Sequence, residues 1–104
     1  MITVLVACKL PAGMDRAAAK LSEEAAPRFQ ALDVLRTKHF LYHEADGLGG
    51  GFYAWEACAQ ADAFHCEAWL DPMEERMGSH PELTFFETAV AVDNTVGEVQ
   101  VQAA

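Results

Sequence analysis

The chain has 104 residues, of which 16 are acidic and 7 basic, and its formal net charge is -9 at pH 7. This length has room for one domain, so we expect residues 1–104 to form a single unit without a second catalytic domain. The excess of acidic residues leaves no basic stripe that could neutralise a nucleic-acid backbone or an anionic membrane surface, and neither is an expected partner.

The N-terminal segment and the cysteines indicate the compartment. The first eight residues, MITVLVAC, are apolar, but Lys9 and Pro11 end this run well short of the about 18 residues that a membrane span needs. The three cysteines, Cys8, Cys58 and Cys66, contain no C-x-x-C pair. An odd set of this kind fits structural thiols in a reducing compartment better than a disulfide framework. We therefore expect a soluble cytoplasmic protein.

The first half of the chain alternates between strand and helix patterns. Ile2–Cys8 is a short run rich in β-branched residues and is predicted to be a buried strand. Apolar residues at three-and-four spacing from Met14 to Leu32 predict an amphipathic helix, which Pro27 should break or kink because its ring conflicts with a helical carbonyl. Val34–His43 is predicted to be the second strand.

The second half repeats this alternation. Residues 44–50 are predicted to form a glycine-rich turn, and Gly51–Glu56 the third strand. Helical spacing returns from Ala57 to Met77, where Pro72 is expected to separate two helical pieces. Leu83–Val92 is predicted to be one long final strand.

The resulting β-α-β-β-α-β order predicts an α+β fold, the ferredoxin-like sandwich, with a four-stranded antiparallel sheet and both helices on one face. Residues 94–104 are expected to form a C-terminal arm or a short edge strand. The first and last strands are apolar on both faces, yet two helices can cover only one of them. Because a large exposed apolar sheet face is unusual on a soluble monomer, we expect a homodimer that packs sheet against sheet about a two-fold axis.

The glycine-rich stretch GLGGGFYAWE at residues 47–56 is the one segment that resembles a phosphate-binding loop. A P-loop is excluded because no lysine follows the glycines. The spacing from Gly49 to Ala54 fits G-x-G-x-x-A, but strand-forming residues follow where that motif requires a helix. These features favour a bend between two strands over a cofactor loop.

A hairpin at this bend that pairs Tyr42 with Tyr53 and Phe40 with Trp55 would bring four aromatic side chains to one face of the sheet. A slip of one residue would scatter them. Such a cluster can pack in a core or a dimer interface. It can also wall a cavity for a flat ring, with the Tyr hydroxyl and Trp N–H groups as polar handles.

Three segments together resemble a known family. LRTKHFLYHEADGLGGGFYAWE at residues 35–56, then Phe64 and Trp69, then FFETAVAVDN at residues 85–94, are similar to the small YdhR-type monooxygenases of the dimeric α+β barrel superfamily. This superfamily also holds the antibiotic-biosynthesis monooxygenases. The resemblance extends from the first strand to Asn94. It implies a homodimer whose two sheets form a barrel, with a pocket in each subunit between sheet and helices.

Some members oxygenate polycyclic phenols or quinols with O₂ and without metal or flavin, which requires a base that deprotonates the substrate. Histidine suits this role because its unperturbed pKa is about 6.5. We expect His65, four residues before Trp69 on a helix, as the first catalytic candidate, and the mid-strand His39 as the second. The expected walls of the substrate pocket are Phe40, Tyr42, Tyr53, Trp55 and Trp69. No C-x-x-C pair occurs, so neither a metal nor another cofactor is expected.

The predicted function is a small monooxygenase that uses O₂ on a small aromatic, quinol or polyketide-like substrate. Two alternatives remain: a non-catalytic small-ligand-binding or stress-related accessory module, and a proton-transfer enzyme of the lactone isomerase type. Haem-degrading relatives carry an Asn on or near the first strand, where this chain has Thr3, Cys8 and Lys9. That difference disfavours haem degradation.

Overall fold

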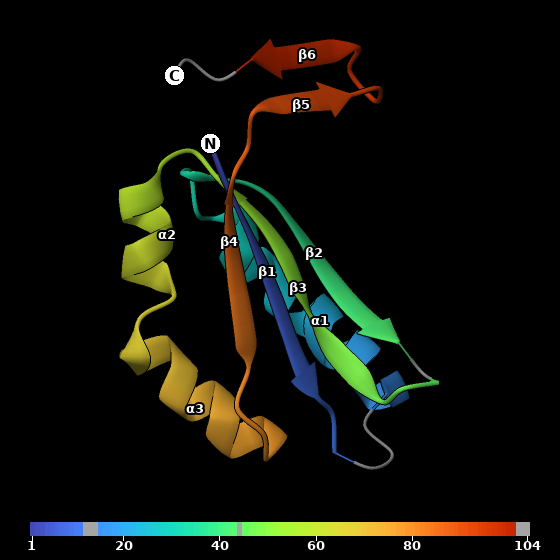
Figure 1. Ribbon diagram of the computed structural model, residues 1–104. Helices are drawn as coiled ribbons and strands as arrows, with labels where there is room; N and C mark the ends of the chain where they lie inside the picture. The colour runs from blue at the N-terminus through green and yellow to red at the C-terminus, as the bar shows by residue number, and fades with distance from the viewer. Residues whose placement is uncertain (12–14, 44, 102–104) are drawn as a thin grey trace.

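The computed structural model describes residues 1–11, 15–43 and 45–101. Its elements, in chain order, are β1 (Ile2–Lys9), α1 (Asp15–Gln30), β2 (Leu35–His43), β3 (Leu48–Trp55), α2 (Cys58–Phe64), α3 (Glu67–Met77), β4 (Glu82–Glu87), β5 (Val90–Asp93) and β6 (Glu98–Val101). Strands β1 to β4 form one sheet with the spatial order β2-β3-β1-β4, and every neighbouring pair is antiparallel. This confirms the predicted ferredoxin-like α+β sheet (Figure 1).

The alternation of side chains along β1 determines which face of the sheet is the core. Ile2, Val4, Val6 and Cys8 are buried, whereas the residues between them are more exposed. Successive strand residues point to opposite faces, so these four side chains lie on the face that α1 and α2 cover. Trp55 of β3 joins this core with only 1% of its surface exposed.

The helices differ from the sequence prediction in where they are interrupted. α1 continues through Pro27 to Gln30, and the predicted start at Met14 lies outside the described residues. The second helical stretch is divided at residues 65–66 rather than at Pro72, which lies inside α3. The backbone leaves the helical conformation at His65, whose side chain is buried in the core. The break between α2 and α3 therefore coincides with the burial of His65, and Pro72 does not interrupt the helix.

The β2–β3 hairpin has a different register from the predicted one. Phe40 lies opposite Gly51 instead of Trp55, and Lys38 lies opposite Tyr53. The difference is an even number of residues, so the predicted grouping of aromatic residues on one face is preserved although their partners change. The turn is also shorter than predicted, because β3 already begins at Leu48 and includes three glycines.

Gly50 shows why β3 contains glycine at this position. A Cβ added at Gly50 would overlap the carbonyl oxygen of Val6 in the neighbouring strand β1. Only glycine permits this close approach of the two backbones. The glycines therefore belong to the sheet rather than to the bend.

The predicted single strand from Leu83 to Val92 is wrong, because it is divided at residues 88–89 into β4 and β5. β4 pairs with β1 up to Glu87, opposite Ile2 at the start of β1. Thr88 still donates its backbone N–H to the Met1 carbonyl, and the chain then turns away from β1. β5 then pairs with β6 in a separate two-stranded sheet. The predicted C-terminal arm is thus one half of a hairpin at the end of the main sheet (Figure 1).

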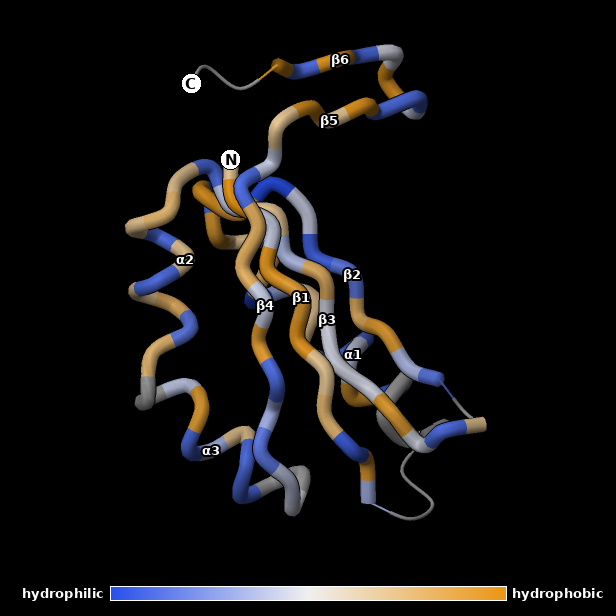
Figure 2. Tube along the Cα trace, viewed as in Figure 1, coloured by the Kyte–Doolittle hydropathy of each residue, from blue (hydrophilic) through white to orange (hydrophobic). Residues whose placement is uncertain are grey.

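The face of the main sheet away from the helices carries exposed apolar side chains that no described element of the single chain covers. Leu5, Leu41, Leu48 and Phe86 are each at least one-third exposed, and their registers place them together on this face. The β5–β6 hairpin adds further exposed valines, and Figure 2 shows hydrophobic positions along both of its strands. Among the described helices, none is long and apolar enough to span a membrane.

Candidate functional site

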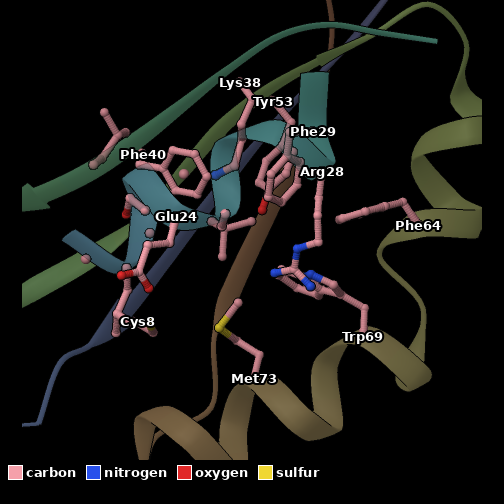
Figure 3. Close-up of a pocket in the computed structure, with 18 of the residues that line it drawn as sticks. Cys8, Glu24, Arg28, Phe29, Lys38, Phe40, Tyr53, Phe64, Trp69 and Met73 are labelled. Atoms are coloured by element: carbon pink, nitrogen blue, oxygen red, sulfur yellow. The ribbon is translucent and has the colours of Figure 1, made fainter. Parts of the chain in front are cut away.

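A cavity of about 630 Å³ lies between the helix-facing side of the sheet and helices α1 and α3. Its walls are largely apolar, and five aromatic rings contribute to them (Figure 3). These rings belong to Phe29, Phe40, Tyr53, Phe64 and Trp69. A cavity of this size and composition can enclose a small polycyclic molecule.

The aromatic rings of the cavity pack against one another in edge-to-face and tilted contacts. Phe29 of α1 packs edge-on against Phe40 of β2, with ring centres 5.4 Å apart, and against Tyr53 of β3 at 6.1 Å. Trp69 of α3 meets Tyr53 edge-on at 6.5 Å. Rings in this arrangement restrict each other's rotation, so the walls on the sheet side and the helix side form one connected surface.

Lys38 places a positive charge among these rings. Its ammonium nitrogen lies 4.0 Å from the ring centres of both Phe40 and Tyr53, and 5.4 Å from that of Phe29. Within the described part of the chain, no carboxylate forms an ion pair with it. Burial lowers the pKa of Lys38 to about 8 because the charged form loses its hydration.

Gly51 makes the space that this ammonium group occupies. A Cβ added at Gly51 would overlap the Lys38 nitrogen and crowd the Tyr53 ring. Since Gly51 also lines the cavity, the absence of a side chain at this position keeps the amine at the cavity wall.

The Tyr53 hydroxyl and the Cys8 thiol, which both belong to the cavity wall, remain protonated at neutral pH. Burial raises the pKa of the Tyr53 hydroxyl, and the nearby Cys8 thiolate would raise it further. Burial also raises the pKa of the Cys8 thiol. Tyr53 is therefore a hydrogen-bond donor at the cavity wall, while Cys8 is a small apolar group rather than a reactive thiolate.

The helix side of the cavity carries one charge of each sign. Glu24 and Arg28 line it from α1, one helical turn apart, and Figure 3 shows both side chains extending from that helix. They can contact polar groups of a bound molecule at the side opposite the sheet. Lys38 is thus the charge on the sheet side of the cavity.

His65, the first catalytic candidate from the sequence, is a buried residue with 6% exposure and does not line the cavity. Its Nε2 accepts a hydrogen bond of 3.2 Å from the indole Nε1 of Trp55, and its Nδ1 has no partner among the described residues. It packs edge-on against Tyr53 at 4.6 Å and Trp69 at 4.9 Å. Burial, and then the positive charge of Lys38, lower its pKa to about 4. His65 is therefore a neutral group supporting two cavity walls.

His39, the second catalytic candidate, lies on the other face of the sheet. It is exposed, pairs with Phe52 across the hairpin and packs beside that ring at 5.4 Å. Within one chain the sheet therefore separates His39 from the cavity. His39 therefore does not line the cavity, because alternating strand residues point in opposite directions.

The predicted pocket residues divide into two groups. Phe40, Tyr53 and Trp69 line the cavity. Tyr42 shares their face of the sheet but is 52% exposed near the hairpin end, and Trp55 is buried in the core beside His65. Neither Tyr42 nor Trp55 belongs to the cavity wall.

The sequence prediction missed the charged residues of the site, namely Lys38, Glu24 and Arg28. Lys38 offered a signal, because it occupies the same strand face as Phe40 and Tyr42, where an apolar residue is expected. Nothing in the helical spacing of α1 distinguishes Glu24 and Arg28 from solvated residues. Among the described residues, no group of three His, Cys, Asp or Glu side chains could hold a metal ion.

Comparisons with known proteins support the fold. The chain is similar to a solved structure from Deinococcus radiodurans described as a "putative antibiotic biosynthesis monooxygenase", with a TM-score of 0.67 and 11% sequence identity. The similarity covers 89% of this chain and 97% of that one. The two proteins share a fold. This confirms the α+β fold that the family resemblance implied for the single chain. No protein-family model matches the chain. A search of curated proteins finds no match.

Proposed function

We propose that this protein is a small monooxygenase that uses O₂ to oxidise an electron-rich phenol or quinol bound in the aromatic cavity, without metal or flavin. The observation that carries this proposal is the Lys38 amine, placed 4.0 Å from two aromatic ring centres and without a carboxylate partner in the described chain. A flat phenol stacked in this cavity would find at its edge, on the sheet side, an amine that favours its anion.

Lys38 supplies the acid–base chemistry of this reaction. Its pKa of about 8 lies near neutrality, so the free amine can accept a phenolic proton, and the resulting ammonium stabilises the phenolate. We assign this role to Lys38 in place of His65 and His39. The Nε2 of His65 is occupied by Trp55, and His39 lies across the sheet.

The electrons for O₂ come from the substrate in this scheme. The phenolate passes one electron to O₂, and the resulting superoxide combines with the substrate radical at a ring carbon that bears hydrogen. The peroxide anion formed there takes back the proton held by Lys38 and becomes a hydroperoxide. Loss of water from the hydroperoxide leaves a carbonyl, so one oxygen atom stays in the product and the other leaves as water. The apolar walls keep bulk water from the anion, and the protonated Tyr53 hydroxyl can donate a hydrogen bond to the developing oxyanion.

The test is oxygen uptake by purified protein in the presence of a chelator, with a panel of anthrones, naphthohydroquinones and simple phenols. We expect uptake with at least one polycyclic member and a loss of about 100-fold in kcat for Lys38→Met. Lys20→Met removes an exposed lysine of α1 and is the matched control. Unchanged uptake in Lys38→Met would overturn the role of Lys38. Saturable binding without turnover of any member would favour a ligand-binding module, and conversion under strictly anaerobic conditions a lactone isomerase-type enzyme.

We further propose that the protein works as a homodimer through its open sheet face. The exposed side chains of Leu5, Leu41 and Phe86 on this face support the proposal. A second copy offers the same apolar surface, so an isologous sheet-to-sheet contact would cover both.

A further inference from the structure

Lys38 has the surroundings of a nucleophilic amine as well as those of a base. It lines the cavity from the middle of β2, and aromatic rings surround its nitrogen on the sheet side and the α1 side. Aromatic rings attract an ammonium group but cannot accept its protons as a carboxylate does. Nothing among the described residues therefore holds this amine in its charged state by an ion pair.

Burial makes the uncharged amine abundant at mildly alkaline pH. With a pKa of about 8, roughly half of the Lys38 side chains are neutral at pH 8. The neutral fraction is thus about a hundred times that of an ordinary lysine, whose pKa is about 10.4. A lysine desolvated in an apolar pocket is the usual setting for imine formation with carbonyl compounds.

We propose that the cavity also takes flat aromatic aldehydes and ketones, and that Lys38 condenses with their carbonyl carbon to form an imine. The lone pair of Nζ attacks the carbonyl carbon, a C–N bond forms as the C–O π bond breaks, and one proton passes from the nitrogen to the oxygen to give a carbinolamine. The hydroxyl group then takes up a second proton and leaves as water, a C=N bond forms, and the nitrogen releases its remaining proton. The products are the imine and one water molecule, and no oxidant or reductant is consumed.

Other groups of the cavity fit this condensation. The Tyr53 hydroxyl stays protonated because burial raises its pKa, and it lines the same wall, where it can donate a hydrogen bond to the carbonyl oxygen. Gly51 leaves the approach to Nζ free of a side chain. Phe29 and Phe40 pack edge-on beside the amine, so a flat ring can lie against them with its carbonyl group toward Lys38.

The chain is well suited to a direct test because it has only three lysines. Lys9 and Lys20 are exposed, so they serve as internal references for Lys38. The protein is incubated at pH 8 with 2-naphthaldehyde and sodium cyanoborohydride, which reduces an imine to a stable secondary amine. Peptide mapping by mass spectrometry then gives the rate of modification at each lysine.

We expect Lys38 to be modified at least 10 times faster than Lys9 or Lys20, with a rate that saturates with aldehyde concentration. An excess of 2-methylnaphthalene, which has no carbonyl group, should slow the modification of Lys38 and leave Lys9 unaffected. Lys38→Arg should reduce total labelling to the level of the exposed amines, whereas Lys20→Arg should leave the Lys38 adduct unchanged.

Comparable rates at all three lysines, or modification of Lys38 that the hydrocarbon does not slow, would overturn the proposal. The mapping uses the wild-type protein, so the result stands even if Lys38→Arg fails to fold. The reaction is run under argon, and its outcome is therefore independent of the proposed oxygenation. An imine without oxygen uptake, or oxygen uptake without an imine, separates the two proposals.

Discussion

Lys38 and Tyr53 lie opposite each other in the β2–β3 pair, and the Lys38 ammonium nitrogen is 4.0 Å from the centre of the Tyr53 ring. The register of the hairpin therefore places the Lys38 amine, the charged group on the sheet side of the cavity, against Tyr53, whose hydroxyl group is protonated. Each is perturbed mainly by the same cause, loss of hydration, which lowers the pKa of Lys38 and raises that of Tyr53. Both residues thus stay closer to their neutral forms than they would in water.

Gly51→Ala should displace the Lys38 amine without removing it. The new Cβ would occupy the position of the nitrogen, and the flexible lysine side chain can move aside more easily than the strands. We expect at least a 10-fold slower modification of Lys38 by 2-naphthaldehyde and a similar loss of oxygenase activity, with an unchanged circular dichroism spectrum.

Gly47→Ala is the control for Gly51→Ala. Gly47 has a φ of 61° in the hairpin turn and no atom within 4 Å of an added Cβ. The substitution should lower the free energy of unfolding by about 1 kcal/mol through backbone strain and leave Lys38 reactivity unchanged. Equal reactivity of Lys38 in Gly51→Ala and in the wild type would show that the space at Gly51 does not position the amine.

Lys38→Met should stabilise the protein at pH 7 although it lowers the proposed oxygenase activity. A lysine whose pKa is lower in the folded state than in the unfolded chain disfavours folding wherever it is charged. The shift from about 10.4 to about 8 corresponds to at most about 3 kcal/mol. Lost ring contacts of the ammonium offset part of this, so we expect a gain of about 1–2 kcal/mol in urea unfolding.

The pH dependence of this difference identifies its origin. Between pH 8 and 10.5 the wild type should regain stability as Lys38 loses its proton, so the difference from Lys38→Met should shrink. Tyr53 and Cys8 have raised pKa values and act in the opposite direction at high pH, but both variants contain them. Glu24 and Arg28 of α1 and the buried His65 are also common to both. A gain in Lys38→Met that does not change with pH would point to packing rather than to charge.

Much of the fold follows from local patterns, whereas the site depends on register. The β-branched run of Ile2–Cys8 and the three-and-four spacing of α1 predicted a strand and a helix correctly, and the β-α-β-β-α-β order then predicted the sandwich. The hairpin register was not predictable, since glycines inside β3 carry turn signals and the close approach of Gly50 to Val6 is visible only in three dimensions. The prediction that the aromatic residues share one face was still correct, because the predicted register differed from the observed one by an even number of residues.

The role of His65 was also not predictable from the sequence. Its position four residues before Trp69 correctly predicted that the two side chains lie close together, and their ring centres are 4.9 Å apart. The sequence does not reveal that the helix ends at His65 or that Trp55 donates a hydrogen bond to its Nε2. A histidine that supports a cavity wall and one that reaches into the cavity have the same helical spacing. Only burial and hydrogen bonding distinguish them.

Binding of a flat aromatic ligand should be reported by one of the two tryptophans. Trp69 lines the cavity, whereas Trp55 is 1% exposed and lies outside its wall. We expect 2-naphthol to quench the fluorescence of Trp55→Phe, which retains Trp69, about as strongly as that of the wild type. Trp69→Phe should lose most of the quenching. Full quenching in Trp69→Phe would place the ligand elsewhere.

The proposed homodimer should have twice the 11.3 kDa mass of the chain in light scattering at micromolar concentration. Phe86→Glu introduces a charge on the open sheet face, where Phe86 is 52% exposed, and should shift the mass towards the monomer because a buried unpaired carboxylate is costly. Gln30→Glu adds the same charge at the exposed end of α1 and should leave the mass unchanged. A wild-type mass of 11.3 kDa would refute the homodimer.

Protonation of His65 should destabilise the fold in mild acid. Its pKa is about 4 in the folded state and about 6.5 in an unfolded chain, so the unfolded state binds more protons between these values. Stability is therefore complete above pH 6.5 and falls as the pH decreases towards 4, by about 2 kcal/mol between pH 7.5 and pH 5. Lys38, whose charge also lowers the His65 pKa, remains protonated throughout this range.

Urea unfolding of the wild type and of His65→Gln at the two pH values isolates this effect, because the exposed carboxylates and Lys38 are common to both proteins. His65→Gln should be less stable at pH 7.5 but should lose about 2 kcal/mol less than the wild type on acidification. His80→Gln is the matched control, since His80 is exposed and pairs with Glu74 at 3.0 Å. It should retain the full acid sensitivity of the wild type. Equal losses in the wild type and His65→Gln would mean that the imidazole of His65 is not kept neutral by its burial among the rings of Tyr53 and Trp69.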